Sequence, residues 1–80
     1  MAAAVKYSVI WEGIVIGEIE SIRCDNFHGF GRWHALESPT TTRFYQELKN
    51  GKELRVKIGN LMDGRIDQVP GNEIEFTAVI

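Results

Sequence analysis

The chain has 80 residues, of which 44% are hydrophobic and 25% charged, and its formal net charge is −2. This length fits a single domain, residues 1–80, and the composition excludes a disordered polar chain. A nucleic-acid binder usually carries a surplus of positive charge, which is missing here.

The single cysteine, Cys24, cannot form a disulfide within the chain, whereas small secreted domains usually depend on several disulfides. The N-terminal residues show neither a positively charged start nor a long apolar run, so no secretory signal is expected. No window approaches the roughly 18 apolar residues of a membrane-spanning helix. We therefore expect a cytoplasmic protein that does not bind a membrane.

Residues 5–22 are predicted to form a β-hairpin. Residues 5–11 alternate in hydrophobicity, which is typical of a strand with one buried face. Glu12-Gly13 supplies the turn, because glycine readily adopts a positive φ. Residues 14–22 form the return strand.

The return strand changes phase along its length. With a two-residue turn, Val9 faces Ile16, but Ile19 then falls on the opposite face from Ile16. This pattern indicates either a bulge at Gly17 or a second buried face for Ile19.

Residues 25–39 show no clean period, and Gly29 and Gly31 are unfavourable in a helix. We predict a long loop here, with a short extended piece around residues 30–35. Loops of this length in compact domains are usually functional or disordered, and the aromatic content argues against disorder.

Residues 40–50 can be interpreted in two ways. As a helix, the segment is capped by Thr41 or Thr42, places Phe44 and Leu48 one turn apart, and is closed by Gly51. As a strand, it uses Asn50-Gly51 as a hairpin turn into the next strand. High helix propensity before Asn50 favours a short helix.

The last third of the chain predicts a three-stranded meander. Residues 53–58 and 73–80 alternate cleanly, and a short strand at 65–69 lies between them. The turns are predicted at Asp63-Gly64 and at Pro70-Gly71-Asn72. Clean alternation means one buried and one solvated face, which is typical of antiparallel sheets.

Together these elements predict an α+β, mainly β fold: a hairpin, a long loop, a short helix and a three-stranded meander. Its five short antiparallel strands would form a strongly bent sheet. The alternative is a small SH3-like or OB-like barrel.

The candidate binding residues cluster in the predicted loop, where aromatic and long cationic side chains follow one another. Such side chains dominate binding hot spots because they bury much area at little entropic cost. Phe30 stands between two glycines and is expected to be exposed, whereas Phe27 and Trp33 could fold back into the core. The set comprises Phe27, Phe30, Arg32, Trp33 and His34.

We expect a non-catalytic protein-interaction module that self-associates or binds a protein through this loop or an open sheet edge. The first alternative is RNA or single-stranded DNA binding through the aromatic loop 27–34. That alternative requires a basic patch of Arg23, Arg32 and Arg43, and net charge does not favour it.

The second alternative is a small enzyme in which Asp25 orients His28 or His34. A metal site is not expected, because the spacing of Cys24, His28 and His34 matches no standard zinc pattern. No phosphate-binding or dinucleotide-binding motif is present, so we expect no cofactor and no catalysis.

Short motifs spread over most of the chain carry a family resemblance. They are Gly17-Glu18-Ile19, Asp25-Asn26-Phe27, Gly31-Arg32-Trp33, Phe44-Tyr45 with Leu48, Asp63-Gly64-Arg65 and Glu75-Phe76-Thr77. With these motifs the chain resembles a loose group of short uncharacterised bacterial proteins. In that group proline-tryptophan often stands where this chain has Asn26-Phe27. The resemblance implies a bacterial origin and a shared fold, and it implies no activity.

Overall fold

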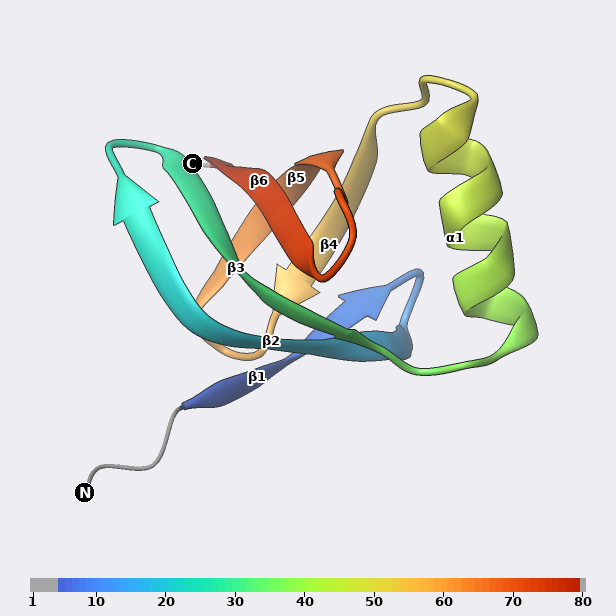
Figure 1. Cartoon of the computed structure of the whole chain (residues 1–80), viewed down its shortest axis with the longest axis horizontal. Coiled ribbons are helices and arrows are strands. Elements are labelled where there is room, and N and C mark those ends of the chain that lie inside the picture. The colour runs from blue at the N-terminus through green and yellow to red at the C-terminus, as the bar shows by residue number, and fades with distance from the viewer. Residues whose placement is uncertain (1–4, 80) are drawn as a thin grey trace.

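The structure, a computed structural model, describes residues 5–79. Along the chain it contains β1 (Lys6–Trp11), β2 (Ile14–Asp25), β3 (His28–Ala35), α1 (Pro39–Lys49), β4 (Leu54–Ile58), β5 (Met62–Gln68) and β6 (Glu73–Val79) (Figure 1). Within this part of the chain, no helix has the length and hydropathy needed to span a membrane.

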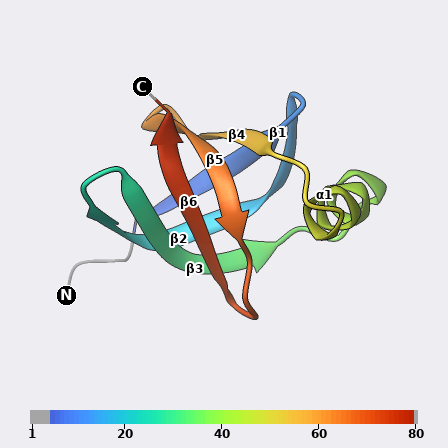
Figure 2. The same ribbon diagram turned by 90° about the horizontal axis from the view of Figure 1, so that it is seen from above.

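The six strands close into a small barrel in the order β1-β2-β3-β6-β5-β4, with every neighbouring pair antiparallel (Figures 1 and 2). The chain forms two consecutive meanders, β1–β2–β3 and β4–β5–β6, which meet at two seams. The β3–β6 seam has five paired positions, and the β1–β4 seam has two. The predicted mainly β fold is confirmed. Of the two predicted arrangements, a strongly bent sheet and a small barrel, the structure shows the barrel.

The predicted count of five strands is one short, because residues 28–35 form β3 and the long loop predicted there is wrong. The two glycines taken as breakers lie where the barrel interior has no room for a side chain. A Cβ on Gly29 would lie 2.3 Å from the Phe76 ring, and one on Gly31 would lie 2.8 Å from the Ile19 side chain. Glycine therefore lets β3 pass close to the core. Because the sheet closes, no strand within residues 5–79 has an open edge along its full length. Binding through an open sheet edge, one of the two predicted contacts, would need such an edge.

The first hairpin and its turn form as predicted, and the bulge prediction is confirmed beside Gly17. Val9 pairs with Gly17 instead of Ile16, so Ile16 is the extra residue of the bulge. Ile16 and Ile19 are consequently both fully buried, at 0% exposure.

The turn between β4 and β5 lies at residues 59–61, so the turn predicted at Asp63-Gly64 is wrong. Gly64 lies inside β5, where its missing side chain makes room for the Phe76 ring. The turn before β6 forms as predicted, with Gly71 at φ +61°. Ile80, the last residue of the strand predicted at 73–80, lies outside the described residues.

The helix interpretation of residues 40–50 is confirmed, but its start is earlier than predicted. The N-cap is Ser38, whose Oγ accepts a hydrogen bond from the Thr41 amide at 3.1 Å. Pro39 fits the first turn because that position needs no backbone donor. Gly51 follows the C-cap with φ +78°.

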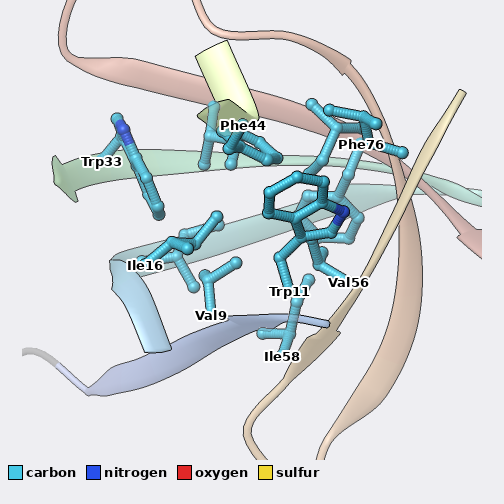
Figure 3. Packing of buried hydrophobic residues seen from close by; sticks show 12 residues of the cluster. Val9, Trp11, Ile16, Trp33, Phe44, Val56, Ile58 and Phe76 are labelled. Atoms are coloured by element: carbon cyan, nitrogen blue, oxygen red, sulfur yellow. The ribbon is translucent and has the colours of Figure 1, made fainter. Parts of the chain in front are cut away.

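α1 closes one end of the barrel. Phe44 points from the helix into the core, is fully buried, and meets Trp11 edge-to-face with ring centroids 5.5 Å apart (Figure 3). The buried Thr41 hydroxyl donates to the Ile16 carbonyl at 3.3 Å, which fixes the helix to β2. The core consists of Val9, Trp11, Ile16, Ile19, Trp33, Phe44, Leu54, Val56, Ile58, Ile66, Ile74 and Phe76.

Candidate binding site at the open end of the barrel

The barrel end opposite α1 has no helix over it in the described part of the chain (Figures 1 and 2). The start of β1, the second half of β2 and the β4–β5 turn surround a groove of about 460 Å³ at this end. The lining is mostly apolar, and we call this set of residues the mouth: Val5, Tyr7, Ser21, Ile22, Cys24, Leu61 and Met62.

A second bulge in β2 directs side chains into the mouth. The β2–β3 register shifts between Glu20 and Arg23, and Ser21 adopts φ +57° there. Without the extra residue, Ile22 would point outward, because side chains alternate along a strand. With it, Ile22 and Cys24 both face the interior side of the barrel. A non-glycine residue at positive φ is strained, and such strain is often found at functional sites. Here the strained residue, Ser21, belongs to the bulge that directs Ile22 and Cys24 into the mouth.

The mouth leaves large apolar side chains partly in water. Val5 is 59% exposed and Leu61 48% exposed, while Tyr7, Ile22 and Met62 pack partly against the core. Barrel mouths are common ligand sites, because the strands hold an apolar concavity rigidly in place. This end of the barrel therefore has the shape and chemistry of a binding site.

The structure separates the residues predicted to form one aromatic binding loop. Phe27 is 58% exposed at the β2–β3 turn, whereas Trp33 is 5% exposed and its Nε1 donates to the Tyr45 hydroxyl at 2.6 Å. Phe30, expected to be exposed, is only half-buried. It lies with the other even-numbered residues, Arg32 and His34, on the outer face of β3.

The basic patch required for nucleic-acid binding is incomplete. Phe30 and Arg32 share a groove of about 310 Å³ with Arg23 on the outer face of the barrel. Arg43 instead lies on α1, where its guanidinium is 2.7 Å from a carboxylate oxygen of the β1–β2 turn. Two of the three arginines therefore remain together. Trp33 is buried, so Phe30 is the aromatic residue of the predicted loop that lies beside them.

His28 contacts carboxylates other than Asp25. Its Nδ1 lies 3.5 Å from Asp67 Oδ2 and its Nε2 3.3 Å from Glu75 Oε1. Asp25 faces His28 across the β2–β3 ladder, but both residues are exposed on the strand surface. Since the two ring nitrogens face different carboxylates, these groups do not converge on one ion. Within residues 5–79, no cluster of three or more potential ligands is suited to a metal.

The other histidine, His34, is hydrogen-bonded to Glu20. His34 Nε2 lies 3.1 Å from Glu20 Oε1, and this hydrogen bond lowers the pKa of the Glu20 carboxyl below its usual value of 4.5. Lys6 and Arg32 lower this pKa further through their charges, while partial burial opposes the shift. The carboxylate is therefore favoured in the folded state.

This lowered pKa predicts a pH-dependent contribution to stability. The contribution is present above the unfolded-state pKa and is lost as the pH falls through the lower folded-state pKa. Glu20→Gln should lower the melting temperature at neutral pH, and the difference from wild type should shrink below pH 4.5. Thermal unfolding followed by circular dichroism, from neutral pH to below pH 4.5, measures this difference in melting temperature. Glu18→Gln, on the same face of β2, is the control. A Glu20→Gln difference that stays constant with pH would contradict the prediction.

Comparisons of the chain with protein-family models, with curated proteins and with solved structures find no match. What the mouth binds therefore has to be inferred from its own shape, lining and charge.

Most mouth residues were missed in the sequence. Of these residues, the sequence singles out only Cys24, as a potential metal ligand. Two signals were available: Ile22 is out of phase with Ile19, and Leu61-Met62 places two large apolar residues directly after a Gly-Asn pair. Both patterns indicate apolar side chains that ordinary strand alternation does not account for.

Proposed function

We propose that this protein is a non-catalytic interaction module that binds a protein partner through the mouth. The observation that supports the proposal is the groove of about 460 Å³ lined by partly exposed apolar side chains. Covering apolar surface is favourable by about 25 cal/mol per Å². The mouth would therefore gain stability from an occupant that takes its residues out of water.

The lining favours a protein partner over a nucleic acid. Phosphate groups need cations beside them, whereas the residues that line the mouth include no lysine or arginine. The exposed rim residues Val5 and Leu61 extend the apolar surface beyond the groove itself. A partner that presents apolar side chains on a surface of its own would cover both.

A cytoplasmic, bacterial setting belongs to the same proposal. Cys24 is exposed and free, and a reducing compartment would keep it as a thiol. The resemblance to short bacterial proteins points to the same setting.

The proposal is tested by NMR with indole as a small apolar probe, on protein at a concentration where light scattering shows a monomer. Indole should shift the methyl resonances of Ile22 and Met62, because its ring fits an apolar concavity. The methyls of Leu36 and Ile14, which are exposed elsewhere, serve as controls. Met62→Asp should abolish the Ile22 shift, and Leu36→Ser should leave it unchanged. Shifts centred on Phe30, or no shifts at all, would refute the proposal.

A further inference from the structure

We infer that the occupant of the mouth is a second copy of this chain, bound in a two-fold symmetric dimer. This inference rests on the proposed function and specifies its partner. A two-fold interface joins one patch to the same patch on the other copy. The patch must therefore carry both a projection and the concavity that receives it.

Phe27 supplies a projection near the concavity. It follows the mouth residue Cys24 by three positions, at the tip of the β2–β3 hairpin, and its side chain is 58% exposed. The Phe27 carbonyl accepts a hydrogen bond from the Ala78 amide at 2.6 Å, which ties the tip to β6. The β2–β3 turn and the start of β1 lie at the same side of the molecule, away from α1 (Figures 1 and 2). A two-fold axis can then place each Phe27 against the mouth of the other copy.

The exposed charged residues around the mouth are balanced in sign. Five charged residues lie next to mouth residues in the sequence, of which Glu20 is half-buried and pairs with His34, and the other four are exposed. Within residues 5–79 none of these four forms an ion pair, whereas Arg32, Arg43, Arg55 and Arg65 each do. Two are cations and two are anions: Lys6, Arg23, Asp25 and Asp63.

This balance suits a second copy better than a strongly charged partner. A rim of one sign would repel itself across a two-fold axis, whereas a mixed rim can pair cations with anions of the other copy. Lys6, Arg23, Asp25 and Asp63 form no close ion pair within residues 5–79, so such pairing would be available to them.

A dimer interface of ordinary size would take a modest share of the surface. A standard interface covers about 800 Å² of each partner, which is about 15% of the 5388 Å² accessible surface of this chain. The exposed apolar side chains that would form its centre are Val5, Phe27 and Leu61, at 59%, 58% and 48% exposure.

The test is the mass of the intact protein in solution, measured by light scattering and sedimentation from about 1 μM to about 1 mM. Wild type should be a dimer at the upper end of this range. Phe27→Ser and Leu61→Ser should each weaken dimerisation by about tenfold or more, because each removes a buried apolar contact. Leu36→Ser is the matched control, since Leu36 is 52% exposed and precedes α1 at the other end of the barrel. Phe30→Ala, on the outer face of β3, should likewise leave the dimer intact.

Cys24 provides a second measurement that needs no variant. Because it lines the mouth, its alkylation by iodoacetamide should slow as the protein concentration rises and the dimer forms. This readout keeps the inference testable if Leu61→Ser does not fold.

A wild-type protein that stays monomeric, or a dimer lost through Leu36→Ser but not Phe27→Ser, would overturn the inference. If indole still shifts Ile22 and Met62 in that monomer, the interaction proposal stands and only the identity of the partner is wrong. If indole also fails to bind, both are wrong.

Discussion

Gly29→Ala is expected to destabilise the folded protein by about 1–3 kcal/mol, the usual cost of overpacking a core. The new Cβ would lie 2.3, 2.6 and 2.9 Å from three atoms of the Phe76 ring. Phe76 is fully buried, and Gly64 is also close to its ring, so the ring is held in a tightly packed place. Urea unfolding followed by circular dichroism measures the loss.

A double-mutant cycle tests the cause. Phe76→Leu removes ring atoms that the new methyl would meet, so Gly29→Ala should cost less in that background. The matched control is Gly17→Ala, whose Cβ would lie 2.5 Å from the His34 carbonyl oxygen. Phe76→Leu should not relieve that backbone clash. Additive free energies for the Gly29–Phe76 pair would show that the ring is not what limits this position.

Phe44→Ala is expected to cost about 3–5 kcal/mol, as for other large aromatics removed from a core. A domain of this size is stabilised by about 4–12 kcal/mol in total, so this single change removes a large share. Phe44 is the one fully buried apolar side chain of α1, and its ring contacts those of Trp11 and Tyr45. Without it, α1 should loosen from the barrel end before the strands unfold.

Two measurements separate loosening of the helix from general unfolding. Hydrogen exchange should accelerate first at the amides of α1, and tryptophan fluorescence should shift to the red as Trp11 meets water. Gln46→Ala, at an exposed position of the same helix, should change stability by no more than about 0.5 kcal/mol. A loss below about 1 kcal/mol for Phe44→Ala would mean that α1 is not held by this side chain.

Alternation identified most of the barrel because most strands have one face in the core. In β4, for example, Leu54, Val56 and Ile58 are buried while Arg55 and Lys57 are exposed. Such a pattern reports burial directly, so the first hairpin, β4 and β6 were predicted correctly. The sequence predicted the barrel only as the alternative to a bent sheet. Closure depends on contacts between strands far apart in the sequence, and alternation within one strand does not report these contacts.

β3 escaped prediction because its inner face carries glycines. Gly29 and Gly31 face the core, while Phe30 faces outward, so the hydrophobic pattern of a strand is absent. The reason is Phe76, whose ring fills the space that a side chain on Gly29 would take. Nothing near Gly29 in the sequence reveals this requirement.

The candidate site was equally hard to read. The aromatic residues of the predicted loop are adjacent in sequence, yet Trp33 enters the core and Phe27 stays in water. The mouth is assembled from three separate segments and depends on the bulge at Ser21, which turns Ile22 inward. Proximity in sequence was therefore a poor guide, because strand parity and a single extra residue decide which side chains meet.

The short seam between β1 and β4 gives the mouth a role in the dynamics of the whole barrel. At this seam the two meanders are joined by two paired positions and by the hydrogen bond from the Gly59 amide to the Ser8 carbonyl. The other seam, between β3 and β6, has five paired positions. Parting this seam breaks fewer ladder contacts than parting any other, so native-state opening should begin there. Val5 and Leu61 lie on either side of it, one before β1 and one before β5. An occupant that contacts both would hold the barrel shut, so binding at the mouth and resistance to opening would rise together.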